Sequence, residues 1–295
     1  MRITQSMLSN NMMNNLTNSY SRMNTQMEKL STGKKINRPS DDPVIAMKGM
    51  GYRSQVTEIE QYQRNTNEMH TWMDNSDTAL DKATQTLQKM RELAVQASND
   101  TYDAEERQNI REEVEQLKEH LIDIANTNAN GNYIFNGTDT DIKPITVQED
   151  GSLTFSGESD PFMIEVAKGT KLQANVDTSE IFDEELFNTD IQNFIDALGE
   201  GDNQAAIEDS IETLDESIND VINARADLGA RMNRVELVEN RLSEQEVTAT
   251  KTLSENEDID YAKAITELMT QESVHRAALS AGGRIIQPTL IDFLR

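Results

Sequence analysis

The chain contains no cysteine and little proline. Without cysteine it can form no disulfide, thiol nucleophile or cysteine-based metal site. Five prolines occur in 295 residues, and all of them lie outside two long intervals, 44–143 and 162–287. Intervals of that length without proline permit long uninterrupted helices. Aromatic residues make up only 5% and hydrophobic residues 36%, so we expect one or two modest cores.

Positive charge is scarce in the middle of the chain. The formal net charge is −26, but residues 1–64 carry +4 and residues 262–295 carry +1, which leaves −31 for residues 65–261. Such an acidic middle repels nucleic acid and anionic membranes, so we expect neither as a partner. Near-neutral ends can pack closely in a polymer while the acidic middle faces water.

Long apolar runs are also missing. No stretch approaches the roughly 18 apolar residues of a membrane span, and no apolar segment follows Met1 as in a Sec signal peptide. We therefore expect any export to use another route.

Sustained heptad spacing is the strongest positive signal. Apolar residues recur at alternating steps of four and three from Ile45 to Ala97 and again from Ile207 to Leu253. A repeat of this kind predicts coiled-coil packing of two long helices. A third helix follows the break at 98–101, and Ser40 or Asp41 is expected to cap the first long helix just before Pro43.

Between the two long helices the period changes. The short runs Tyr133–Phe135, Ile145–Val147, Leu153–Phe155 and Phe162–Val166 favour strands, and Asn-Gly, Asp-Gly and Ser-Gly pairs separate them. The predicted fold is mainly α, a long antiparallel coiled-coil rod formed by the N- and C-terminal halves, with a small β-rich inserted domain. The predicted organisation is terminal helices at 1–40 and 265–295, a rod domain at 41–132 and 188–264, and an outer insert at 133–187.

Both chain ends carry amphipathic helices with too little apolar surface to be stable alone. We expect them to pair with each other and with other copies, so they should stay disordered until assembly. The predicted assembly interface consists of Leu16, Tyr20, Met23, Met27, Leu30, Leu268, Leu279, Ile286, Leu290 and Leu294.

No catalytic or metal-binding motif emerges. The three histidines, His70, His120 and His275, fall on three different predicted helices, and no phosphate-binding or nucleophile motif is present. We predict a protein that is not an enzyme and needs no cofactor or metal.

The two ends resemble a known family. Residues 30–43 read LSTGKKINRPSDDP and residues 285–295 read IIQPTLIDFLR. These segments resemble the two terminal signatures of the bacterial flagellin family, and the resemblance extends over roughly 1–135 and 190–295. Residues 37–43, 131–138 and 257–268 are most similar to the members that join the hook to the filament.

The resemblance implies a structural role. Such a subunit forms a ring or helical assembly with itself, contacts the proximal hook–filament junction protein, and nucleates flagellin polymerisation. It is secreted by the flagellar type III apparatus and resides at the hook–filament junction, and its C-terminal helix is the expected site for an export chaperone. Residues 88–96 also resemble a flagellin segment that an innate immune receptor contacts, with Arg91 and Glu92 as the matched polar residues; the simpler interpretation is ordinary rod surface.

Three alternatives remain at this stage. The chain could be a short flagellin, which would be the bulk filament subunit. It could be a secreted coiled-coil needle-tip or effector protein, which would leave both terminal signatures unexplained. An enzyme using its abundant carboxylates is the most distant.

Overall fold

The computed structural model of the protein describes residues 5–99, 104–148, 152–156, 160–176, 181–199 and 204–286. The chain divides into two compact units. The terminal unit comprises Met1–Glu58 and Gln245–Arg295, and the central unit is Ile59–Glu244. The terminal unit is therefore built from two segments at opposite ends of the sequence, whereas the central unit is one continuous segment.

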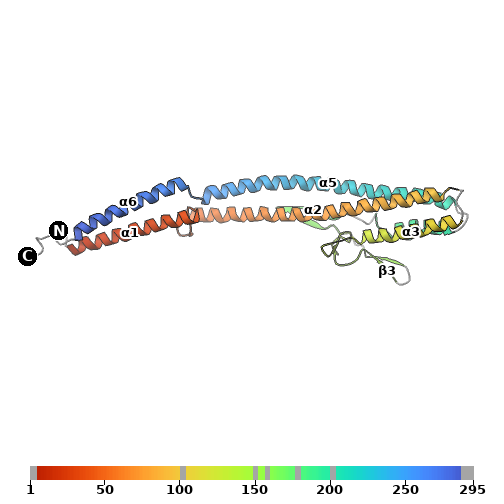
Figure 1. Ribbon diagram of the computed structural model, residues 1–295, viewed down its shortest axis with the longest axis horizontal. Coiled ribbons are helices and arrows are strands. Elements are labelled where there is room, and N and C mark those ends of the chain that lie inside the picture. The colour runs from red at the N-terminus through yellow and green to blue at the C-terminus, as the bar shows by residue number, and fades with distance from the viewer. Residues whose placement is uncertain are drawn as a thin grey trace, which may run out of the picture. The chain divides into compact units, whose positions relative to one another are not determined.

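The terminal unit is helical. It contains α1 (Gln5–Thr32), the beginning of α2 (Pro43–Ala97), the end of α5 (Gln204–Glu257) and α6 (Tyr261–Ile286). Helices α1 and α6 lie side by side (Figure 1). Helix α2 begins at Pro43, as the sequence predicts, but its cap is Asp42, one residue beyond the expected pair. The Asp42 carboxylate accepts hydrogen bonds from the backbone N–H groups of Val44 and Ile45.

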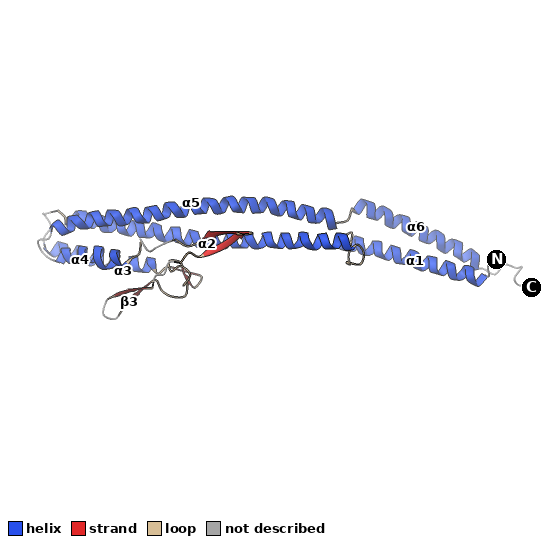
Figure 2. Ribbon diagram, turned by 180° about the vertical axis from the view of Figure 1, so that it is seen from behind, coloured by secondary structure: helices blue, strands red, loops and turns tan. Residues whose placement is uncertain are grey.

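The central unit contains the remainder of α2 and α5, which run antiparallel beside each other (Figure 2). Helix α3 (Ala104–Ala125) lies beside them, with the π-helical turn η1 (Leu186–Asp190) and α4 (Ile191–Gly199). The predicted heptad positions are buried here: Met69, Met73, Leu80, Leu87 and Met90 are fully buried on α2. The antiparallel helical rod and the mainly helical fold class are confirmed.

Helix α2 also buries a second row at seven-residue spacing, Trp72, Ala79, Thr86 and Leu93. Two buried rows on one helix require neighbours on two sides. The Trp72 ring packs against Phe162 of the insert, with ring centroids 5.5 Å apart. Large buried side chains are consequently numerous in this unit.

Ion pairs fix the register of α2 against α5. Arg225 donates to both Asp77 and Asp81, at 3.0 and 2.7 Å, and Arg91 pairs with Asp215. These partners hold the pKa of the Arg225 guanidinium above its usual value, chiefly through the hydrogen bond to Asp77. Arg225, a charged residue at a heptad position of α5, thus finds its hydrogen-bond partners on the facing helix α2.

Between α3 and η1, the described residues form three two-stranded antiparallel pairs. They are β1 (Asn128–Ala129) with β2 (Asn132–Tyr133), β3 (Ile145–Val147) with β4 (Leu153–Phe155), and β5 (Met163–Ala167) with β6 (Thr170–Gln173). Strands β3 and β4 have the predicted bounds. The predicted strand Tyr133–Phe135 is confirmed at Tyr133 and wrong at Ile134 and Phe135. These two residues lie in a turn that directs both side chains into the core, where they are buried.

Candidate assembly surface

The α1–α6 pair is the part of the molecule that the sequence marks for assembly. The two helices run antiparallel. The Gln26 side-chain amide donates to Glu267 at 2.8 Å, while Met12, about four turns nearer the N-terminus, packs directly on Gly282. A side chain at position 282 would collide with the Met12 methyl group. Glycine therefore permits the close approach of the helices at this level.

The predicted interface residues fall into three groups. Leu16, Met23, Leu30 and Leu268 are half-buried in the seam between the helices. Tyr20, Met27 and Leu279 are exposed, at 60%, 53% and 51%. The side chain of Ile286 and the residues Leu290 and Leu294 lie outside what the structure describes.

An exposed apolar row runs along α1. Met13, Tyr20 and Met27 follow one another at seven-residue spacing, and each is more than half exposed. Helix α6 likewise exposes Ile265, Met269, Val274 and Leu279. Exposed apolar surface on this scale is typical of an interface with another protein.

The terminal unit has almost no core to offset this exposure. Among its described residues the buried hydrophobic side chains are Ala249 and Ala264, both small. Burial of a large aliphatic side chain contributes about 1.5–3 kcal/mol, and the unit lacks such contributions. Its helices consequently need further apolar partners to reach the stability of the central unit.

A charged clasp joins the α1–α2 loop to the end of α5. The Glu257 side chain is 5% exposed and pairs with Lys34 at 2.9 Å and with Arg53 at 2.5 Å. Burial acts to raise the Glu257 pKa, but hydrogen bonds from Arg53 and Lys34 outweigh it, so the pKa lies below its usual value. Because Gly49 has no side chain, the Glu257 carboxylate can lie directly against it.

Backbone contacts extend the clasp. Lys35 N–H donates to the carbonyl of Glu257 at 2.7 Å, and Ile259 N–H donates to the carbonyl of Gly33 at 2.9 Å. Gly33 has a φ of +72°, and a side chain there would meet the Tyr261 hydroxyl. The loop that carries the N-terminal signature is thus fixed against the acidic link between α5 and α6, which periodicity alone did not reveal.

The segment that resembles a receptor contact lies on α2. Arg91 is partly exposed and engaged with Asp215, whereas the Glu92 side chain is 72% exposed. Of the two matched residues, Glu92 is therefore the more accessible. Recognition by an immune receptor stays a prediction.

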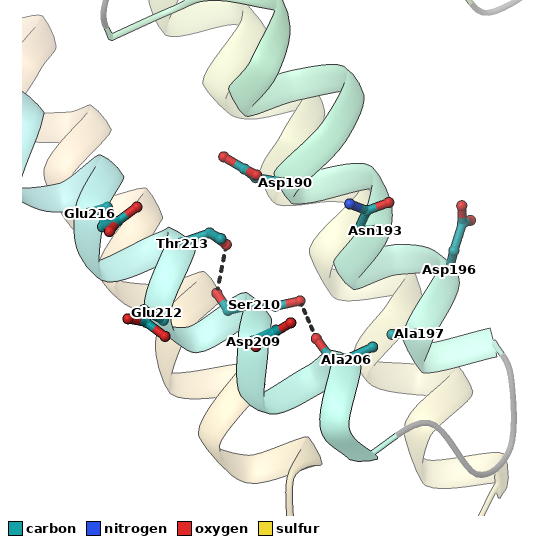
Figure 3. Close-up of a pocket in the computed structure, with 10 residues that line it drawn as sticks. All are labelled: Asp190, Asn193, Asp196, Ala197, Ala206, Asp209, Ser210, Glu212, Thr213 and Glu216. Atoms are coloured by element: carbon teal, nitrogen blue, oxygen red, sulfur yellow. Dashed lines mark hydrogen bonds between the residues drawn. The ribbon is translucent and has the colours of Figure 1, made fainter.

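An acidic groove lies between α5 and the continuous segment formed by η1 and α4. Asp190 and Asp196 line one side, and Asp209, Glu212 and Glu216 line the other (Figure 3). Burial, then the charges of Glu185, Asp183 and Glu216, raises the pKa of Asp190. The described residues hold no group of three or more histidine or acidic side chains arranged to bind a metal ion.

None of the described helices is long and apolar enough to cross a membrane.

The helical ends match two family models. Residues 3–140 match the bacterial flagellin N-terminal helical region, and residues 211–294 match the bacterial flagellin C-terminal helical region. Together these segments cover most of the chain, which therefore belongs to the bacterial flagellin family of structural flagellar proteins.

Individual relatives come from both branches of this family. The chain is 25% identical to flagellar hook-associated protein 3 of Escherichia coli, over 95% of this chain and 96% of that protein. It is 28% identical to flagellin of Bacillus subtilis, over 94% of each. A solved flagellar hook-associated protein of Vibrio parahaemolyticus has the same fold, with a TM-score of 0.68 and 24% identity over 74% of this chain and 100% of that one.

Proposed function

We propose that this protein is the flagellar subunit that joins the hook to the filament and nucleates flagellin polymerisation there. The observation that carries the proposal is the terminal unit, where α1 exposes Met13, Tyr20 and Met27. Among the described hydrophobic residues of this unit only Ala249 and Ala264 are buried. Copies of the chain would cover these rows by packing α1–α6 pairs around a common axis. The similarity to hook-associated protein 3 over nearly the full chain supports the junction position.

Its partners follow from that position. One edge of the assembly would contact the proximal junction protein and the other would receive flagellin, while lateral contacts join copies of this chain. The protein would be secreted through the flagellar export apparatus and act as a structural part with no enzymatic activity.

An export chaperone would cover α6 before assembly. The helix exposes Ile265, Met269 and Leu279 at 48%, 63% and 51%, and its neighbour α1 leaves this side uncovered. A chaperone with an apolar groove would keep this surface from associating prematurely.

Copy number separates the junction subunit from a short flagellin, the alternative favoured by the similarity to the Bacillus subtilis protein. We expect purified flagella of the source bacterium to contain this chain at roughly a hundredth or less of the bulk filament protein, because a junction occupies only the base of a filament. Quantitative mass spectrometry with labelled peptides from residues 65–89 and 226–241 measures it. A chain that forms the bulk of the filament mass would contradict the junction role and establish a flagellin.

A further inference from the structure

A basic pocket lies where α1, the loop that follows it and the start of α6 meet. Its volume is about 210 Å³, and its lining includes Lys29 from α1, Lys35 from the loop and Lys263 from α6. All of these segments belong to the terminal unit. Since a water molecule takes about 30 Å³ in the liquid, the pocket has room for a carboxylate group and part of the side chain that carries it.

The pocket contains two carboxylates of its own, and both are engaged by other donors. The Asp260 side chain accepts the backbone N–H of Lys263 at 3.1 Å, and Glu267 accepts the Gln26 amide at 2.8 Å. Neither Lys29 nor Lys263 forms an ion pair with a carboxylate of the described residues. The acidic residues of the pocket therefore leave these two ammonium groups without a direct counter-charge.

Cations beside the pocket are arranged differently. Lys34 and Arg53 share the buried Glu257 carboxylate. Lys35, the next residue along the chain, donates its ammonium to the backbone carbonyl of Glu255 at 2.7 Å. A carbonyl accepts a hydrogen bond but carries no charge to neutralise the ammonium. Positive charge without a matching carboxylate is thus concentrated in the pocket.

The charge of Lys29 also reaches Asp41 in the loop. The pKa of the Asp41 carboxyl lies below its usual value, chiefly because the backbone N–H groups of Arg38 and Asn37 donate to it, and Lys29 contributes through its charge. Because two backbone donors already hold this carboxylate, the Lys29 ammonium stays available to a further anion.

Part of the pocket lining is apolar. Ala264 is 2% exposed, and Ile259 is half-buried. A small inorganic anion makes no use of such a surface, whereas a glutamate side chain brings methylene groups behind its carboxylate. The lining therefore favours an acidic side chain of a protein over a free anion.

We propose that this pocket binds an acidic side chain from the middle of another copy of this chain. The charge distribution supports this occupant, because residues 1–64 carry +4 and residues 65–261 carry −31. Contact between the basic pocket of one copy and the acidic middle of the next is favourable, whereas two acidic middles repel each other.

The two surfaces in this contact are different, so the contact is heterologous and can continue from copy to copy. It would add a polar, directional contact to the apolar rows of α1 and α6. Its use in assembly rests on the proposed function.

Zero-length cross-linking with a water-soluble carbodiimide tests the contact directly. The reagent joins a lysine amine to a carboxyl group that touches it and leaves no spacer. In flagellar preparations that retain the hook–filament junction, Lys29 or Lys263 should become linked to an acidic residue within 65–261. The dilute purified monomer should lack these links. Links confined to Asp260, Glu267 or Asp41 in both samples, or no links from either lysine, would overturn the proposal.

Substitution of the lysines tests their contribution. In a deletion strain, the chain with Lys29→Gln and Lys263→Gln should lower the number of filaments per cell by roughly tenfold, since each copy loses two charge-assisted contacts. Lys48→Gln with Lys251→Gln is the matched control, because both lysines are exposed in the terminal unit and lie outside the pocket lining. Lys29→Arg with Lys263→Arg keeps the charge and should retain most filaments.

Equal filament numbers in the double glutamine variant and its control would overturn the proposal. Faster hydrogen exchange of the terminal helices in the glutamine variant than in its control would overturn it as well, since the lysines would then support the fold of the subunit itself. Failure of the wild-type chain to restore filaments to the deletion strain would contradict the proposed function. Restored filaments without the cross-links would contradict the pocket alone.

Discussion

A chain with Tyr20→Asp and Met27→Asp should fold normally as a monomer and fail to support filament growth. Both side chains are more than half exposed in the subunit, so the substitutions remove little packing from it. In an assembly that covers the α1 row, two buried carboxylates without partners would cost several kcal/mol per subunit. We expect swimming to be lost and the substituted protein to appear in the medium.

The control is Leu237→Asp, a substitution at an apolar residue of α5 that is 71% exposed in the central unit. It introduces the same carboxylate at a site away from the terminal helices. The monomer stabilities, from urea unfolding, should agree among all variants within about 0.5 kcal/mol. Normal swimming of the double variant would show that the α1 row stays exposed in the flagellum and would remove the main support for the assembly surface.

Glu257→Gln should lower the stability of the terminal unit and remove the dependence of that stability on acidic pH. The carboxylate is nearly inaccessible and holds both Lys34 and Arg53. Loss of two charge-assisted hydrogen bonds at a buried acceptor lowers stability by about 1.5–3 kcal/mol. Hydrogen exchange of residues 28–58 and 245–262 should accelerate accordingly, with the central unit unchanged.

The direction of the pH effect follows from the lowered pKa of Glu257. The folded state binds this proton less readily than the unfolded state, so the stabilisation is complete above the ordinary glutamate pKa of about 4.3. It is lost as the pH falls from there through the lower folded-state pKa. The wild-type terminal unit should therefore open as the pH drops below about 4, and Glu257→Gln should flatten this response.

Glu255→Gln is the matched control, because Glu255 is exposed and loses the same charge two residues away. Its backbone carbonyl, which accepts from Lys35, is unaffected by the substitution. Equal exchange in the two variants would mean that the clasp contributes nothing to the order of the terminal unit.

Periodicity predicted the central unit well because its helices obey one rule throughout. The heptad positions of α2 face inward along this unit, and the expected positions Met69, Leu80 and Leu87 are fully buried. Heptad spacing is a local property of the chain, so it can be identified without knowing the partner helix.

The same rule was less informative at the chain ends. Tyr20 and Met27 were expected in one interface with Leu16 and Met23, but the subunit places them on an adjacent exposed row. Seam position 19 is a serine, and apolar spacing gives no weight to a small polar residue. Disorder of the terminal helices before assembly, and the contacts of this row with other copies, stay predictions.

Contacts distant in sequence were the least predictable. Glu257 and Arg53 are 204 positions apart, and only the folded path of α2 and α5 brings them together. Strand β6 was missed because Thr170–Gln173 has few β-branched or aromatic residues, and its pairing depends on the turn at Gly169, where φ is +73°.

Deletion of the gene, followed by electron microscopy of the cells and assay of flagellin in the medium, tests the junction role most directly. The account predicts hooks without filaments and flagellin monomers released into the medium, with both defects reversed by the wild-type chain. Bare hooks without released flagellin would identify the chain as the filament subunit itself. Intact filaments on the deletion strain would contradict the account altogether.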